Sequence, residues 1–142
     1  MIGGQVVDIE SEGKKVKRSV VEYIHMNKTA ALIRASVRTG ALLANADRDT
    51  LERLSDYGTR IGLAFQVVDD ILDEEGTTDQ LGKDAGSDRN RGKATFPSVI
   101  GIEQSKQYAA TLISEASESV RPFGSNAAML VSLADFIRTR IF

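Results

Sequence analysis

The stretch LAFQVVDDILDEEG, residues 63–76, decides how the chain is interpreted. Three aspartates, Asp69, Asp70 and Asp73, follow an apolar run, and no lysine or arginine lies within four residues of any of them. At about 100° per residue, Gln66 and the three aspartates share one face of a helix. The opposite face carries Ile61, Ala64, Phe65, Val68, Ile71 and Leu72. The stretch therefore predicts an amphipathic helix whose acidic face lacks neighbouring positive charge.

Magnesium binding explains the uncompensated negative charge of this face better than simple exposure to solvent does. Like charges one turn apart destabilise a helix by a few tenths of a kcal/mol (~0.2–0.5), and Asp is a poor helix former. Mg²⁺ prefers oxygen ligands and is usually held by one or two carboxylates together with phosphate oxygens. The glycine and the spacing of a calcium-binding EF-hand loop are absent. We therefore expect Asp69, Asp70 and Asp73 to hold Mg²⁺ against a phosphate-bearing ligand; the alternative is a solvated face that binds no metal.

Composition narrows the class of protein. The 142 residues suffice for one domain with a core, and the net charge of −2 gives no footprint for nucleic acid. The absence of cysteine excludes disulfides and thiolate metal sites, and it favours a reducing, cytoplasmic location. No apolar run approaches the ~20 residues of a membrane-spanning helix, so we expect no membrane insertion.

The chain is predicted to be all-α. No alternating strand pattern is present, and helices are expected at residues 23–46, 47–75, 96–120 and 126–141. Thr50 is the predicted cap of the second helix and Gly76 its stop. The segment GGQVVDI, residues 3–9, has the pattern of a buried helix. The lone histidine, His25, has no evident partner in the sequence and is interpreted as structural.

Two cationic segments could complete a phosphate site. The polar loop 76–95 contains GKDAGSDRNRGK, with Lys83, Arg89, Arg91, Lys93 and three glycines. Glycines let the backbone approach an anion, and lysines act as mobile point charges. Lys28 and Thr29 begin a helix whose small residues Ala31, Ala35 and Thr39 either pack tightly or line a substrate cavity. Taken alone, the loop is equally consistent with a mobile surface segment.

Four segments together resemble the trans-isoprenyl diphosphate synthases, especially the short-chain farnesyl and geranyl diphosphate synthases. GGQVVDIE (3–10) resembles the family's glycine-glycine-glutamine helix, and KTAALIRASVRTGALLA (28–44) resembles its lysine-threonine helix. GLAFQVVDDILD (62–73) is similar to the second aspartate-rich motif, and LGKDAGSDRNRGKATFP (81–97) to the loop that follows it. The resemblance covers nearly the whole chain, in the family's order and spacing.

The resemblance implies the C-terminal half of the isoprenoid synthase helical bundle and a Mg²⁺-dependent prenyl transfer. An allylic diphosphate would ionise, and the allylic cation would be attacked by isopentenyl diphosphate. Asp69 and Asp73 would ligate Mg²⁺, with Asp70 as support. Lys28, Lys83 and Lys93 would contact the diphosphate, Gln66 and Thr29 would orient the allylic tail or its cation, and Gln5 would line the cavity nearby.

The family's first aspartate-rich motif has no counterpart in residues 1–142, which we interpret as a single α-helical region corresponding to the C-terminal half, with the N-terminal half absent. We therefore expect this chain to be inactive alone and to associate through exposed helix faces, as a homodimer. The alternative is a non-catalytic subunit that binds Mg-diphosphate and partners a catalytic chain. A terpene cyclase is disfavoured, because its second metal site has a different pattern.

Overall fold

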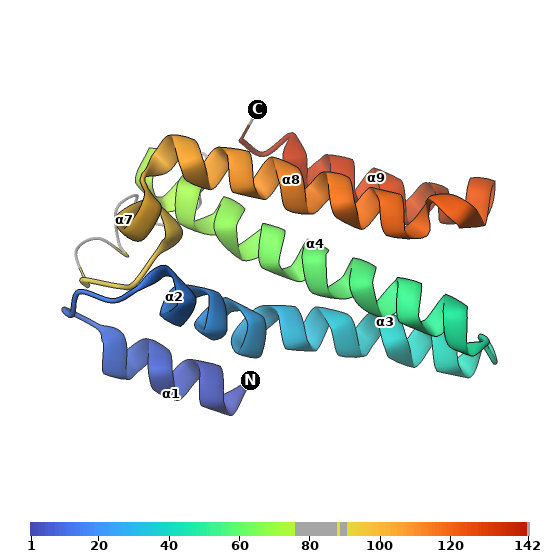
Figure 1. Cartoon of the computed structure of the whole chain (residues 1–142), viewed down its shortest axis with the longest axis horizontal. Helices are drawn as coiled ribbons and strands as arrows, with labels where there is room; N and C mark the ends of the chain where they lie inside the picture. The colour runs from blue at the N-terminus through green and yellow to red at the C-terminus, as the bar shows by residue number, and fades with distance from the viewer. Residues whose placement is uncertain (76–87, 89–90, 142) are drawn as a thin grey trace.

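The computed structural model describes residues 1–75, 88 and 91–141, and these residues form helices and connecting turns with no strand among them. The predicted all-α class is confirmed (Figure 1). The elements in chain order are α1 (Ile2–Ser11), α2 (Arg18–His25), the π-helical η1 (Met26–Ala30), α3 (Ala31–Leu43), α4 (Arg48–Glu75), α7 (Phe96–Ile100), α8 (Ile102–Val120), the 3-10 helix η2 (Arg121–Ala127) and α9 (Ala128–Arg138).

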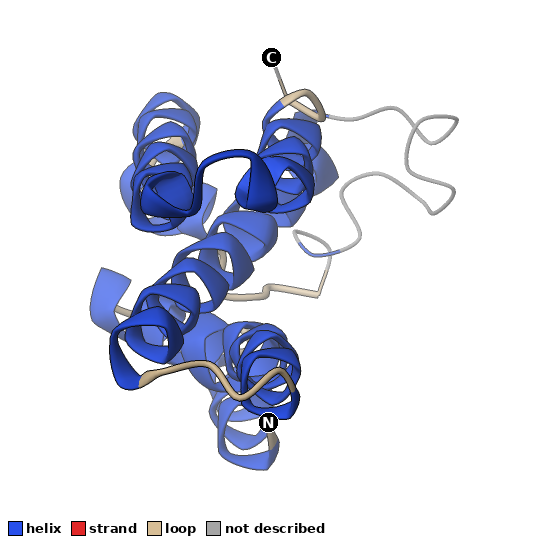
Figure 2. Cartoon of the chain, turned by 90° about the vertical axis from the view of Figure 1, so that its right-hand side faces the viewer, coloured by secondary structure: helices blue, strands red, loops and turns tan. Residues whose placement is uncertain are grey.

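The 28-residue helix α4 is the centre of the bundle. It packs between η1 and α3 on one side and α8 and α9 on the other, and α1 lies outermost beside α2 and η1 (Figures 1 and 2). Its predicted apolar face is largely in the core: Ile61, Ala64, Val68 and Ile71 are buried, whereas Phe65 and Leu72 are half-buried. The acidic residues lie in the last turns of this same helix, at the end where α7 begins.

Glycines of α4 bring the neighbouring helix unusually close. A Cβ atom on Gly62 would lie 2.6 Å from Ala30 Cα, and one on Gly58 would lie 2.9 Å from Arg34 Cα. Both distances are too short for a side chain, so these positions allow backbone-to-backbone packing. Ala35 and Thr39 are exposed, so the close approach of α3 depends on the glycines of α4 and not on the small-residue strip of α3.

Residues 18–43 form one continuous rod that contains a π-helical turn. The rod begins before the predicted start at Tyr23, and residues 26–30 within it are the π-helical η1. Such turns are frequent at functional sites because the extra residue shifts the register of the side chains. Lys28 and Thr29 both lie in this turn, so the predicted substrate-binding positions coincide with the one irregularity in the rod.

Several predicted helix details are wrong. Asp47, not Thr50, caps α4, because the Thr50 backbone N–H donates to Asp47 Oδ1 at 2.8 Å. Hydrogen bonds from the backbone and the side chain of Thr50 lower the pKa of Asp47. The single helix predicted at 96–120 is two helices, because Gly101 has a φ of +81° and a non-helical ψ. The segment predicted to begin a helix at Asn126 starts as the 3-10 helix η2.

Segment 3–9 is helical but not buried as its pattern predicted. Within α1 only Gly4, Asp8 and Ser11 are buried, whereas Ile2 is 84% and Val6 46% exposed. Exposed apolar side chains also occur on α3 and α9, including Leu32, Met129 and Phe136. The helices that the structure describes include none long and apolar enough to cross a membrane.

Candidate functional site

Asp70, the middle carboxylate of the acidic helix, is buried and held by two donors. Its Oδ2 accepts a hydrogen bond from the backbone N–H of Phe96 at 2.9 Å and lies 2.8 Å from His25 Nε2. Burial raises the pKa of Asp70, and the hydrogen bond with His25 opposes that rise. The fold thus supplies the partner of His25 that the sequence did not reveal, and the acidic face has polar neighbours from distant segments. The partners are 45 and 26 residues away in the chain.

Asp73 contacts the backbone of a residue 15 positions further along the chain. Its Oδ2 accepts the backbone N–H of Asp88 at 2.9 Å, and the Asp73 side chain is buried. Asp88 in turn contacts Lys93, with Oδ1 lying 2.9 Å from Nζ. Burial of Lys93 opposes its charge, but the hydrogen bond with Asp88 and the charges of Asp88, Asp8 and Asp70 together raise the pKa of Lys93. Lys93 is thus a cation held at the acidic end of α4.

Lys28 reaches the same region from η1. Its Nζ lies 2.8 Å from Oδ2 of the buried Asp8 in α1. The contact requires α1 to approach η1 closely, and a Cβ on Gly4 would lie only 2.7 Å from the Lys28 backbone nitrogen. The glycine in GGQ therefore has a steric role: it brings Asp8 within reach of Lys28.

These side chains meet around one small hollow. Its volume is about 30 Å³, enough for a water molecule or two. It is lined by Asp8, Ile24, His25, Lys28, Gln66, Asp69, Asp70, Asp88, Lys93, Ala94 and Thr95. A more open hollow of about 500 Å³ adjoins it and shares Asp70, Asp88, Lys93 and Thr95, and it also includes Asp73. The structure thus brings together Lys28, Gln66, Lys93 and the three aspartates named from the sequence.

The remaining predicted residues lie at the edge of this site or outside the description. Gln5 lines a separate apolar hollow of about 360 Å³ on α1, which shares only Lys28 with the first hollow. Thr29 is half-buried in η1 and does not line either of these two hollows. Lys83 falls in the stretch that the structure does not describe.

The donor atoms at the acidic end of α4 bear on the predicted metal site. Within residues 1–75, 88 and 91–141, His, Cys, Asp and Glu side chains form no group of three or more that could hold a metal ion by themselves. An incomplete oxygen set suits Mg²⁺, which takes one or two protein carboxylates and completes its shell with water and phosphate oxygens. The half-buried Asp69 at the edge of the hollow fits that role.

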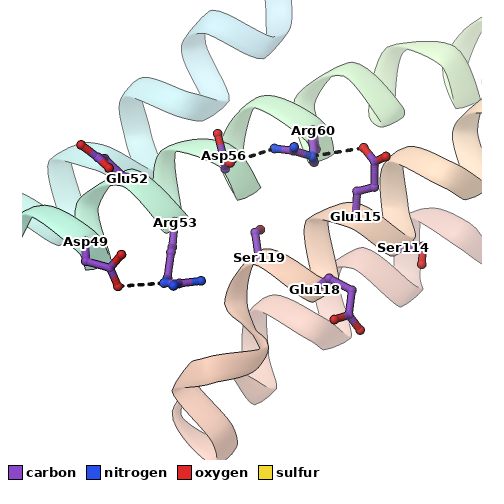
Figure 3. Close-up of a pocket in the computed structure, with 9 residues that line it drawn as sticks. All are labelled: Asp49, Glu52, Arg53, Asp56, Arg60, Ser114, Glu115, Glu118 and Ser119. Atoms are coloured by element: carbon purple, nitrogen blue, oxygen red, sulfur yellow. Dashed lines mark hydrogen bonds and ion pairs between the residues drawn. The ribbon is translucent and has the colours of Figure 1, made fainter.

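Another hollow of similar size lies elsewhere on α4. A groove of about 560 Å³ runs between the first half of α4 and the second half of α8 (Figure 3). Its arginines already have partners: Arg53 Nε is 2.8 Å from Asp49 Oδ2, and Arg60 bridges Asp56 and Glu115, each at 3.2 Å. These are exposed pairs of the kind that an amphipathic surface helix forms. The volume of a hollow alone therefore does not single out the candidate site.

Asp8 and Asp88 match motif positions of the resembled family and His25 was interpreted as structural, but the sequence did not predict which residues these three contact. Each holds a residue that the sequence did single out, namely Asp70, Lys28 and Lys93. A signal for His25 was present, because it precedes Lys28 by three positions and so shares its helix face. No comparable signal pairs Asp88 with Lys93, since both lie in a segment without regular periodicity.

Fold and site together define an all-α protein in which carboxylates of α4 and two lysines line one hollow. The chain is 47% identical over 141 residues to a dimethylallyltranstransferase of Fischerella ambigua, covering 99% of this chain and 41% of that protein. It is 46% identical to the farnesyl diphosphate synthase of Escherichia coli, covering 99% and 48% respectively. A crystal structure of a geranyltransferase from Helicobacter pylori, complexed with magnesium and isoprenyl diphosphate, superposes with a TM-score of 0.81 at 29% identity, covering 100% of this chain and 46% of that one.

The polyprenyl synthetase family model matches residues 1–128. The chain belongs to the polyprenyl synthetase family, as the four sequence segments indicated. It spans about half the length of the curated relatives that it matches.

Proposed function

We propose that this chain supplies the diphosphate-binding half of a short-chain trans-prenyltransferase of the farnesyl or geranyl diphosphate synthase type. The observation that carries the proposal is the convergence of Lys28, Lys93 and the acidic end of α4 on one hollow. The names of the relatives support the reaction: an allylic diphosphate ionises, and isopentenyl diphosphate attacks the resulting allylic cation. The chain corresponds in this proposal to the C-terminal half of such an enzyme.

The lysines account for the electrostatic part of the reaction. When the carbon–oxygen bond of an allylic diphosphate breaks, negative charge develops on the leaving diphosphate, and fixed cations stabilise it. Lys28 and Lys93 are held in place by Asp8 and Asp88 before any ligand arrives. Their ammonium groups therefore need little reorganisation to receive the diphosphate. Lys83 is proposed to add a third contact, and Gln66 faces the same hollow, where its side chain would orient the allylic tail.

Magnesium would be held by Asp69 and Asp73, with Asp70 supporting them from its buried position. When bound, Mg²⁺ neutralises charge on the diphosphate oxygens and makes diphosphate a better leaving group. Asp69 is the more accessible of the two proposed ligands, since Asp73 is 2% exposed and holds the Asp88 backbone through Oδ2. Gln5 and Thr29 are assigned to the tail of the substrate and not to its diphosphate, because neither lines the hollow around Lys28 and Lys93.

A second candidate is a non-catalytic subunit that binds Mg-diphosphate and partners a catalytic chain. The incomplete metal-ligand set among the described residues favours it, because an active prenyltransferase needs further ligands from elsewhere. The exposed apolar side chains of α1, α3 and α9 support association with a second chain, either another copy or a different partner.

The experiment that tests the proposal is a prenyl-transfer assay on the 142-residue chain with Mg²⁺, isopentenyl diphosphate and dimethylallyl or geranyl diphosphate. We expect Mg²⁺-dependent binding of the allylic diphosphate without elongation. Elongated product would contradict the expected inactivity of the chain alone, and its length would identify the prenyltransferase. Failure to bind either diphosphate in the presence of Mg²⁺ would contradict both candidate functions.

A further inference from the structure

His25 is the buried polar group that the proposed reaction leaves unexplained. It lies at the end of α2, is 5% exposed, and contacts the middle aspartate of the acidic motif through Nε2. Its other ring nitrogen, Nδ1, is buried and has no hydrogen-bond partner among the residues that the structure describes. A proton on Nδ1 would be a buried donor without an acceptor, which is costly. The geometry therefore favours the tautomer in which Nε2–H donates to Asp70.

Three residues from three helices close a buried triangle around this hydrogen bond. Asp70 Oδ2 receives both His25 Nε2 and the Phe96 backbone N–H, at 2.8 and 2.9 Å. The Phe96 ring packs against the imidazole, with ring centroids 5.4 Å apart, and Phe96 is fully buried. The triangle joins α2, the acidic end of α4 and the first residue of α7.

The triangle also lies close in sequence to the two lysines. Lys28 follows His25 by three positions, and Lys93 precedes Phe96 by three. The start of α7 is further locked by a capping box, in which Thr95 and Ser98 exchange side-chain-to-backbone hydrogen bonds. A displacement of His25 or of Phe96 relative to Asp70 would therefore move one lysine away from the acidic end of α4.

We propose that His25 is a positioning residue, which holds Asp70 so that this carboxylate fixes Phe96 and thereby presents Lys28 and Lys93 together at the acidic face of α4. Asp70 in this account acts on the protein's own backbone, whereas Asp69 is the carboxylate offered to the metal. The effect of His25 on diphosphate binding rests on the proposed function, but its effect on the hydrogen bond between Asp70 and the Phe96 N–H does not.

The first test uses nuclear magnetic resonance of the 142-residue chain to measure how firmly the Phe96 backbone N–H is hydrogen-bonded to Asp70. Long-range proton–nitrogen spectra should show the Nε2–H tautomer of His25, and the Phe96 amide should be protected from hydrogen exchange. In His25→Gln, whose amide can donate from a similar position, protection should be retained. In His25→Leu, the Phe96 amide should exchange at least tenfold faster.

The matched control is Val21→Ala, which removes buried side-chain volume one turn earlier in α2 and leaves the His25 side chain in place. Its Phe96 amide should stay protected. Equal loss of protection in His25→Gln, His25→Leu and Val21→Ala would reduce His25 to a packing residue and overturn the proposal. An Nδ1–H tautomer in the wild-type chain would overturn it without any variant, even if His25→Leu fails to fold.

A second readout is binding of inorganic pyrophosphate in the presence of Mg²⁺, measured by calorimetry. His25→Leu should weaken it about tenfold, while His25→Gln and Val21→Ala should bind within about twofold of wild type. If wild type binds no Mg-pyrophosphate, the proposed function fails, whereas the exchange and tautomer measurements still decide the role of His25. If wild type binds and His25→Leu binds equally well, the positioning of the lysines is refuted.

Discussion

The two ends of α4 are both rich in carboxylates, but they manage charge in opposite ways. At the first end, Asp49, Asp56 and their arginines form exposed pairs four residues apart along the same helix. At the second end, Asp70 and Asp73 are buried and take their partners from residues 15 to 45 positions away. Local pairs stabilise a helix surface, whereas distant pairs require the whole fold to bring them together.

The charge balance at each end indicates which end of α4 is the better candidate for a binding site. The first end borders a groove of about 560 Å³ between α4 and α8, and its charges are balanced locally (Figure 3). The three aspartates of the second end have no lysine or arginine within four residues in sequence, and among the described residues Lys28 and Lys93 approach them through Asp8 and Asp88. This lack of local neutralisation is our reason for proposing the second end, and not the first, as the diphosphate site.

The largest expected effect comes from Asp69→Ala. Because Asp69 is the least buried of the three aspartates, its loss should abolish measurable Mg²⁺-dependent pyrophosphate binding while helicity by circular dichroism stays unchanged. Asp56→Ala at the first end is the matched control and should bind as wild type does. Unchanged binding in Asp69→Ala would break the contrast between the two ends.

Asp70→Ala should produce the largest loss of stability. The substitution leaves two buried donors, His25 Nε2 and the Phe96 N–H, without an acceptor, at about 1–3 kcal/mol each. Removal of the buried carboxylate offsets part of that cost, so we expect the free energy of unfolding to fall by about 2–3 kcal/mol. Urea denaturation measures it. Asp49→Ala, at the exposed end, should change the denaturation midpoint little, and an equal effect in both variants would remove the distinction.

Lys93→Ala should weaken Mg-pyrophosphate binding by about 1.5–3 kcal/mol, the range for hydrogen bonds to charged groups. The paired control is Lys106→Ala, because Lys106 forms an ion pair with the exposed Glu75 and lines neither hollow at the acidic end. Calorimetric titration distinguishes them. A loss in Lys93→Ala no larger than in the control would return Lys93 to the status of a surface-loop lysine.

Tyr57, between the two ends, gives the smallest effect and a pH dependence. Its O–H donates to the Leu130 carbonyl at 2.8 Å, and burial raises the pKa of Tyr57 from 10.0 to about 12. The folded state therefore keeps a proton that the unfolded state releases, so this contribution to stability is complete below the unfolded pKa and is lost as pH rises towards 12. Tyr57→Phe should cost about 0.5–1.5 kcal/mol at neutral pH. It should also flatten the alkaline fall in unfolding free energy, and a parallel fall in both proteins would contradict the assignment.

The sequence predicted the elements that local periodicity controls. The all-α class and the buried side of α4 followed from helical spacing. Lys28, Gln66, Lys93, Asp69 and Asp70 line one hollow, and Asp73 lines the hollow beside it. Helix ends were less predictable: Asp47 rather than Thr50 caps α4, because a cap depends on backbone geometry and not on residue type alone. The sequence did not predict the break at Gly101, because a glycine inside a helical pattern is often tolerated.

The partners of the site residues could not be predicted, because they depend on tertiary contacts between distant segments. Asp70 looked like an exposed metal ligand, and its burial against His25 and Phe96 appears only when α2 and α7 pack on α4. Asp8 reaches Lys28 only because Gly4 permits close contact between α1 and η1. Spacing placed the acidic residues on one face, but which of them faces a ligand was decided by packing.

The most direct test of the central claim is a calorimetric titration of the wild-type chain with inorganic pyrophosphate, first with Mg²⁺ and then with the metal removed by EDTA. We expect saturable binding of pyrophosphate that requires Mg²⁺, since the carboxylates of α4 repel the anion unless a cation bridges them. Binding of equal strength without the metal, or no binding with it, would show that the acidic end of α4 is not a diphosphate site.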